Sequence, residues 1–218
     1  MNNISKLIDH TILKPEASID DIRNLCIEAK EYGFYSVCVN SAYVNTAYNF
    51  LLHSDVKICS VVGFPLGAMM KEAKAYEAKF AVDSGADEID MVINIGFLKS
   101  GKIDLFERDI KKVRDACRAS VLKVIIETCL LTDKEKILAC KIAKECGADF
   151  VKTSTGFSLK GALEHDVKLM RETVGDEMGV KASGGIKTYE DALKMIESGA
   201  SRIGTSSGIA IVKADKLR

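Results

Sequence analysis

The sequence predicts an α/β protein in which eight parallel strands close into a barrel and each strand is followed by a helix, the (β/α)8 or TIM barrel. Three observations favour this fold: short apolar segments alternate with amphipathic ones, glycines recur at one point in the alternation, and eight strand-like segments fit within 218 residues. Alternation alone also allows a doubly wound open sheet, but the strand number at this length favours the barrel. We expect a single catalytic domain over residues 1–218.

A weak internal repeat marks the places where helices end and strands begin. Four times, a glycine follows a helix-like segment and precedes a strand-like one: Gly33, Gly85, Gly147 and Gly199. Glycine readily adopts the left-handed conformation that commonly ends a helix. Consecutive glycines are about two strand-plus-helix units apart, so a further strand is expected midway between them.

The eight predicted strands are short, apolar and rich in β-branched residues, as strands buried on both faces should be. They are residues 7–13, 35–40, 56–63, 88–94, 121–127, 150–155, 179–183 and 202–206. Capping-box patterns beginning at Ser18, Thr132 and Thr188 predict the starts of three of the intervening helices.

Composition excludes several functions. Basic and acidic residues each number 31, so the net charge of zero offers no broad basic surface for nucleic acid or an anionic membrane. No apolar stretch is long enough to span a bilayer, and residues 1–6 show no secretory leader. The seven cysteines lack a C-x-x-C pair and the three histidines are scattered, so we expect a reduced, cytoplasmic protein without a metal or other cofactor.

Charges within apolar strands indicate the catalytic residues. Asp9, Asp90, Lys152 and Lys181 interrupt or close such strands, where an unpaired charge is costly, although a structural ion pair explains any one of them equally well. Lys152 and Lys181 occupy equivalent places in Val-Lys-Thr-Ser and Val-Lys-Ala-Ser. Neighbouring strands lie about 4.8 Å apart, so equal register would bring the amines together, and repulsion with desolvation would lower the proton affinity of at least one. A neutral amine is what imine-forming catalysis requires.

The loops after the seventh and eighth strands predict an anion site. They contain Gly184 and Gly185, and then the segment 204–208 with the sequence Gly-Thr-Ser-Ser-Gly. Glycines allow backbone N–H groups to approach an anion, and serine hydroxyls add donors. These loops commonly bind phosphate in TIM barrels, which favours a phosphate site over plain turns.

Two further residues are weaker candidates. Glu127 closes the fifth strand and could face the pocket, but a capping or ion-pair role is equally consistent with its position. Cys38, near the end of the second strand, could be a pocket thiol, although a buried apolar role is the better interpretation.

Four motifs together resemble the deoxyribose-phosphate aldolase family over nearly the whole chain. They are Ile8–Thr11, Glu88–Val92, Val151–Gly156 and Lys181–Gly185, followed by Gly204–Ser207. The resemblance implies a class I aldolase of deoxyribonucleoside catabolism that reversibly cleaves 2-deoxy-D-ribose 5-phosphate to D-glyceraldehyde 3-phosphate and acetaldehyde without a metal. Its partners would be these small phosphorylated sugars and aldehydes, not nucleic acid or membrane. Barrels of this size often pair, so a homodimer or higher homo-oligomer is compatible with the sequence.

The resemblance also implies residue roles. Lys152 would form the imine, Lys181 would keep it nucleophilic, and Asp90 would join Lys181 in a proton relay. Asp9, Thr11 and Thr155 would contact the substrate, and Gly156, Gly184, Gly185, Ser206 and Ser207 would hold its phosphate.

The sequence departs from the family pattern in two places. Residues 158–162 are less glycine-rich than in many relatives. Some members have a longer tail whose final tyrosine assists proton transfer, whereas this sequence ends Lys216-Leu217-Arg218, so we expect water or another group to perform that step.

Alternative functions are a different imine-forming aldolase or transaldolase-like enzyme, and a catalytically idle phosphosugar-binding barrel. The intact lysines and Asp90 argue against the idle barrel.

Overall fold

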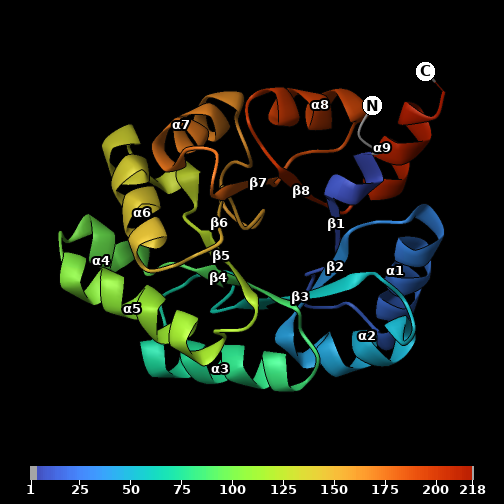
Figure 1. The fold of residues 1–218 in the computed structure, drawn as a ribbon, viewed down its shortest axis with the longest axis horizontal. Helices are drawn as coiled ribbons and strands as arrows, with labels where there is room; N and C mark the ends of the chain where they lie inside the picture. The colour runs from blue at the N-terminus through green and yellow to red at the C-terminus, as the bar shows by residue number, and fades with distance from the viewer. Residues whose placement is uncertain (1–3, 218) are drawn as a thin grey trace.

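A ring of helices surrounds a closed parallel barrel in the computed structural model, which describes residues 4–217 (Figure 1). Each strand pairs in parallel with the next, and β8 returns to pair with β1. The predicted (β/α)8 barrel is therefore confirmed. The predictions about the N-terminal leader and the last residue concern in part residues 1–3 and 218, which lie outside the described residues.

All eight predicted strands are present within their predicted ranges. They are β1 (Ile8–Thr11), β2 (Ser36–Val39), β3 (Lys57–Val62), β4 (Glu88–Val92), β5 (Val121–Ile125), β6 (Phe150–Lys152), β7 (Gly179–Ser183) and β8 (Arg202–Thr205). Several end earlier than predicted. Strand β6, for example, ends at Lys152, although the Thr153 N–H still donates to the Lys181 carbonyl at 3.0 Å.

Helices follow the strands and cover the outside of the barrel. They are α1 (Ile19–Tyr32), α2 (Val44–Leu51), α3 (Lys71–Asp83), α4 (Ile95–Lys99), α5 (Ile103–Ala116), α6 (Asp133–Glu145), α7 (Glu164–Val174), α8 (Tyr189–Glu197) and α9 (Gly208–Asp215). Short 3-10 turns are η1 (Ile4–Leu7), η2 (Ser41–Tyr43) and η3 (Thr128–Leu130). Within residues 4–217, no helix combines the length and the apolar character needed to cross a membrane.

Local sequence signals fix where several of these helices begin and end. The predicted capping boxes at Ser18, Thr132 and Thr188 all form, each hydroxyl accepting from a backbone N–H three residues later. The four repeat glycines all have positive φ, between 66° and 110°. Helix ends are thereby placed so that the chain turns back into the barrel.

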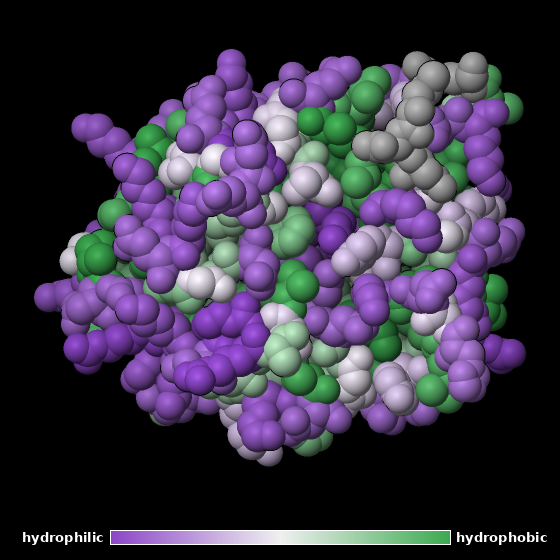
Figure 2. Space-filling view, in the orientation of Figure 1, coloured by the Kyte–Doolittle hydropathy of each residue, from purple (hydrophilic) through white to green (hydrophobic). Residues whose placement is uncertain are grey.

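Side chains alternate along the strands between two interiors. Outward-facing residues such as Ile89, Leu122 and Val180 are fully buried in the apolar layer under the helices. Buried charges come instead from positions such as Asp90 and Lys181. On the face shown in Figure 2, hydrophilic side chains ring the molecule and hydrophobic ones lie scattered between them. The interior of the barrel differs from a typical protein core, because it contains several charged side chains that are buried away from water.

Candidate active site

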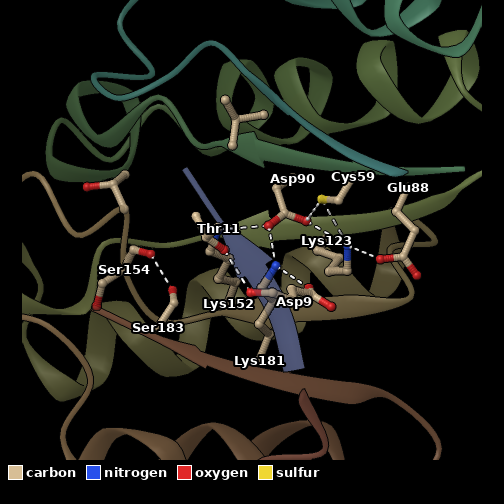
Figure 3. A network of polar contacts seen from close by, with 12 residues as sticks. Asp9, Thr11, Cys59, Glu88, Asp90, Lys123, Lys152, Ser154, Lys181 and Ser183 are labelled. Carbon is tan, nitrogen blue, oxygen red and sulfur yellow. Dashed lines mark hydrogen bonds and ion pairs between the residues drawn. The ribbon is translucent and has the colours of Figure 1, made fainter. Parts of the chain in front are cut away.

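Lys152 and Lys181 are direct partners across β6 and β7, as their near-repeat predicted. Both ammonium groups contact one oxygen of Asp90, with Oδ2 lying 2.7 Å from Nζ of Lys152 and 2.8 Å from Nζ of Lys181 (Figure 3). The prediction that the two amines lie close together is confirmed. The three residues expected to be catalytic form one cluster.

The other oxygen of Asp90 faces a third lysine. Oδ1 lies 2.8 Å from Nζ of Lys123 and accepts from the Cys59 thiol at 3.1 Å. Lys123 also contacts Glu88 at 2.6 Å. Sequence reasoning missed Lys123, although it too interrupts an apolar strand.

Asp9 lies beneath the two lysines, not at the surface of a cavity. Its side chain is fully buried, with one oxygen against Nζ of Lys181 and the other 2.9 Å from Arg202. Arg202 in turn lies over the ring of Tyr35, 3.5 Å from its centroid. The predicted contact between Asp9 and a sugar stays a prediction. In the structure Asp9 instead forms an ion pair with Lys181, which suits a role in positioning that amine.

In Lys181 and Asp90, the contacts with opposite charges together shift the pKa more than burial does. Burial alone would lower the pKa of Lys181, but Asp9 and Asp90 raise it above its ordinary value. Burial alone would raise the pKa of Asp90, but Lys123, Lys152 and Lys181 hold it well below the ordinary value. Lys181 is thus a cation and Asp90 an anion at neutral pH. The lower proton affinity predicted from repulsion between the two amines is therefore wrong for Lys181, because two carboxylates contact its ammonium group.

A cavity of about 380 Å³ opens above the cluster, at the C-terminal ends of the strands. Its walls include Lys152 and six of the predicted substrate-binding residues, Thr11, Thr155, Gly156, Gly184, Gly185 and Ser206. Lys152 is the amine of the cluster that reaches the cavity. Asp9, Asp90 and Lys181 lie below it, and Ser207 lies beside its lining.

The three loops predicted to bind phosphate are joined to one another. Ala162 N–H donates to the Gly184 carbonyl at 3.0 Å, and a Cβ on Gly161 would lie only 2.0 Å from that oxygen. The Ser183 hydroxyl donates to the carbonyl of Ser154 at 2.6 Å. Thr205 Oγ1 donates to the Ile186 carbonyl at 2.7 Å. Backbone groups from three loops therefore converge on one wall of the cavity.

Among the lining residues outside the predicted set, three are charged or aromatic. Lys14 and Lys187 bring positive charge to the cavity that holds Lys152. Phe157 is half exposed and packs edge-on against Phe64, with ring centroids 5.2 Å apart. The position of Lys187, two residues after Gly184-Gly185, is the one signal in the sequence that could have identified it.

The two weaker candidates, Cys38 and Glu127, are buried and contact neighbouring residues of the protein outside the cavity. Cys38 is fully buried and packs in a small apolar cluster with Leu13 and Val61, in agreement with its favoured interpretation. Glu127 is also buried, and its carboxylate accepts from the backbone N–H of Thr155 at 3.3 Å. Neither side chain lines the cavity.

Among residues 4–217, two groups of side chains have donor atoms close enough to share a metal ion. One comprises Cys38, Cys59 and Asp90, and the other Asp133, His165 and Asp166. In the first group three lysines already bind Asp90. In the second, Lys136 lies 3.0 Å from Asp133 and 2.6 Å from Asp166. Neither group lines the cavity, so neither offers an open metal position to a substrate there.

Comparisons with known proteins agree with this geometry. The family model described as DeoC/LacD family aldolase matches residues 4–214. A deoxyribose-phosphate aldolase of Streptococcus gordonii is 60% identical over 97% of this chain and 96% of its own, and one of Clostridium kluyveri is 61% identical over 96% of both. A solved structure of a putative deoxyribose-phosphate aldolase from Coccidioides immitis has a TM-score of 0.96 at 44% identity, covering 99% of this chain and 86% of that one. The tetrameric deoxyribose phosphate aldolase from Aeropyrum pernix has a TM-score of 0.92 at 36% identity, covering 98% and 91%. The chain belongs to the DeoC/LacD family of aldolases.

Proposed function

We propose that this chain is a class I aldolase that reversibly cleaves 2-deoxy-D-ribose 5-phosphate to D-glyceraldehyde 3-phosphate and acetaldehyde, as in deoxyribonucleoside catabolism. The observation that carries the proposal is the position of Lys152, whose amine reaches the cavity and lies 2.7 Å from Asp90, with Lys181 beside it. The shared family and the names of the relatives support the choice of substrate.

Imine formation requires Lys152 to lose a proton. The cluster holds four basic groups and three carboxylates: Lys123, Lys152, Lys181 and Arg202 against Asp9, Glu88 and Asp90. Loss of one proton therefore brings the buried charges into balance. Lys152 is the group from which that proton can leave, because it borders the cavity while Lys181 is fully buried between two carboxylates.

The free amine then attacks C1 of the open-chain sugar, giving a carbinolamine that loses water to form a protonated imine. Asp90 and Lys181 are placed to move these protons, because Asp90 Oδ2 contacts both ammonium groups. When the C2–C3 bond breaks, the C3 hydroxyl loses its proton and C3 becomes the aldehyde of the three-carbon product. The bonding electrons move to the imine and form an enamine on the two-carbon fragment. Protonation at C2 and addition of water release acetaldehyde and restore Lys152.

The three joined loops would hold the phosphate. Gly156, Gly184 and Gly185 have positive φ, between 79° and 87°, which few other residues adopt. They line the cavity with Ser206, whose hydroxyl is a further donor. Lys14 and Lys187 would add charge, and Ser207, the residue after Ser206, would complete the predicted set.

Reductive trapping and product identification test this function together. Sodium borohydride added with acetaldehyde or 2-deoxyribose 5-phosphate should leave a covalent adduct on the peptide containing Lys152, as detected by mass spectrometry. An adduct on another residue, or none, would contradict the mechanism. Products other than acetaldehyde and glyceraldehyde 3-phosphate would indicate a different imine-forming aldolase.

We further propose that the enzyme acts in the cytoplasm as a homo-oligomer. All seven cysteines are free, which suits a reducing compartment. The Aeropyrum pernix relative is described as tetrameric. Light scattering coupled to size-exclusion chromatography measures the assembly, and a monomeric mass at micromolar concentration would contradict it.

A further inference from the structure

Glu127 follows β5 in a backbone conformation that residues with side chains rarely adopt. Its φ is 54° and its ψ 67°, in the left-handed region. On either side, Ile126 N–H donates to the Lys152 carbonyl at 3.0 Å and Thr128 N–H donates to the Thr153 carbonyl at 2.9 Å. The two donors are therefore two residues apart, whereas the two acceptors, Lys152 and Thr153, are adjacent in sequence. Glu127 is the extra residue of a bulge, and bulges redirect side chains.

The redirected side chain binds the segment that follows Lys152. Only 2% of Glu127 is exposed, and both of its carboxylate oxygens lie 3.3 Å from the backbone nitrogen of Thr155. The Thr155 hydroxyl donates to Oε2 of the same carboxylate. That hydroxyl oxygen then accepts from Phe157 N–H at 3.1 Å. The buried carboxylate therefore binds Thr155 directly, and Thr155 in turn binds Phe157, within the turn formed by residues 155–157, here called the 155–157 turn.

This turn forms part of the wall proposed to bind phosphate. Thr155, Gly156 and Phe157 all line the cavity. Gly156 also packs against the next loop, because a Cβ added to Gly184 would lie 3.4 Å from its Cα. Glu127 itself does not line the cavity. Its hydrogen bonds reach the cavity wall through the turn that it holds, and its charge also acts on Lys152.

We propose that Glu127 is a positioning residue that sets the 155–157 turn for recognition of the substrate phosphate. The inference rests on the proposed function, because it requires the wall of the 155–157 turn and Gly184 to be the phosphate site. Backbone N–H groups bind an anion well only when they are fixed in direction. The carboxylate provides that fixation while both of its oxygens face Thr155, so it holds the turn without entering the cavity. Burial raises the pKa of Glu127 while the Thr155 hydrogen bonds oppose this shift, as expected for a buried carboxylate that accepts several donors.

Substrates with and without phosphate test the proposal. Cleavage of 2-deoxyribose 5-phosphate and of 2-deoxyribose is measured for wild type, Glu127→Gln and Glu127→Ala. For Glu127→Ala we expect kcat/KM for the phosphorylated sugar to fall at least about tenfold more than for the free sugar, mainly through KM, since charge-assisted hydrogen bonds are among the stronger ones. Glu127→Gln should give a smaller difference, because the amide oxygen can still accept from Thr155. Inorganic phosphate should inhibit cleavage of the free sugar more weakly in Glu127→Ala than in wild type.

Two further variants separate positioning from general support. Thr155→Val removes the hydroxyl that joins Glu127 to Phe157, so it should reproduce the selective loss, and the double variant should lose little more. Glu197→Gln, at an exposed glutamate at the end of α8, should behave as wild type with both substrates. Borohydride trapping with acetaldehyde checks that each variant keeps a folded Lys152 site.

Each outcome decides one question. Equal losses for both sugars in Glu127→Ala, with unchanged inhibition by inorganic phosphate, would overturn the positioning role. Should the glutamate variants fail to fold, Thr155→Val and phosphate inhibition of it still decide the matter, because an equal loss there also overturns the role. Absence of cleavage of either sugar by wild type would instead overturn the proposed function.

Discussion

Lys152 and Lys181 share a single carboxylate oxygen, Oδ2 of Asp90, at 2.7 and 2.8 Å. One oxygen that faces two ammonium groups holds them together despite their repulsion, and it offers a short route for a proton between them. The aldolase cluster therefore depends on the charge of Asp90 as much as on the lysines.

Asp90→Asn should destabilise the protein strongly. Neutralising this fully buried carboxylate leaves three lysines poorly compensated, and removing one partner of a buried ion pair typically costs about 3–5 kcal/mol. Urea unfolding measures the change in the free energy of unfolding. Asp83→Asn, in the exposed pair with Lys79, is the matched control and should change stability little. If both variants were equally stable, the cluster would contribute no structural stability.

Lys181→Met should slow imine formation at neutral pH. Removing a permanent neighbouring cation lets Asp90 hold the Lys152 proton more firmly, so the rate of borohydride trapping should fall by about tenfold or more and reach its maximum at higher pH. Lys187→Met removes a cation from the cavity wall and should mainly raise KM. A pH–rate profile that Lys181→Met leaves unchanged would contradict the role of Lys181.

Acid should weaken the fold through Asp9 and Asp90. Burial alone would raise the pKa of Asp9, but Lys181, Lys123 and Arg202 lower it, as the lysines do for Asp90. A carboxylate with a lowered folded pKa stabilises fully above its unfolded pKa, about 3.9, and loses that contribution as the pH falls toward the folded value. We expect the free energy of unfolding to decline below about pH 4. The decline should be smaller in Asp9→Asn, and an identical slope would argue against this assignment.

Gly161→Ala should separate the loops proposed to bind phosphate. Its Cβ would lie 2.0 Å from the Gly184 carbonyl oxygen, so one of the two backbones must move. We expect a higher KM for the phosphorylated sugar than in wild type, measured by steady-state kinetics. Leu159→Ala, at a residue of the same loop that is 85% exposed, is the control and should have little effect. Equal KM values would show that this contact does not shape the binding wall.

Prolonged EDTA treatment should leave the aldolase rate unchanged. The proposed electron sink is the imine of Lys152, and neither potential metal-binding group lines the cavity. The measurement compares turnover before and after exhaustive dialysis against the chelator. A loss of activity that zinc restores would reverse the expectation.

The sequence predicted the site residues that lie in repeated motifs. It missed residues that reach the site only because the sheet closes into a barrel. Lys152 and Lys181 were placed together because successive units of a barrel carry equivalent residues in equal register, which the ladder between β6 and β7 confirms. Lys123 carried the same signal, a charge inside an apolar strand, and could have been found. Glu88 and Arg202 stand at strand starts, where charges are ordinary, so nothing local marked them.

Depth within the barrel could not be predicted. Asp9 and Thr11 are two residues apart on β1, yet Thr11 lines the cavity and Asp9 lies below it. The tilt and stagger of the strands decide this difference, and they follow from closure of the whole sheet. The bulge at Glu127 was missed because the mostly apolar residues 121–126 suggested a strand that continues unbroken to residue 127.

The stacking of Arg202 on Tyr35, together with the buried Asp9 and Glu88, closes the barrel at the N-terminal ends of its strands. The cavity opens on the other side of this cluster, and Lys152 is the amine of the cluster that lines it. In the proposed mechanism the two-carbon fragment stays covalently bound to Lys152 as the enamine, so in the cleavage direction glyceraldehyde 3-phosphate would leave first. In the synthetic direction acetaldehyde would then bind before glyceraldehyde 3-phosphate, which makes the order of substrate binding a consequence of the covalent step on Lys152.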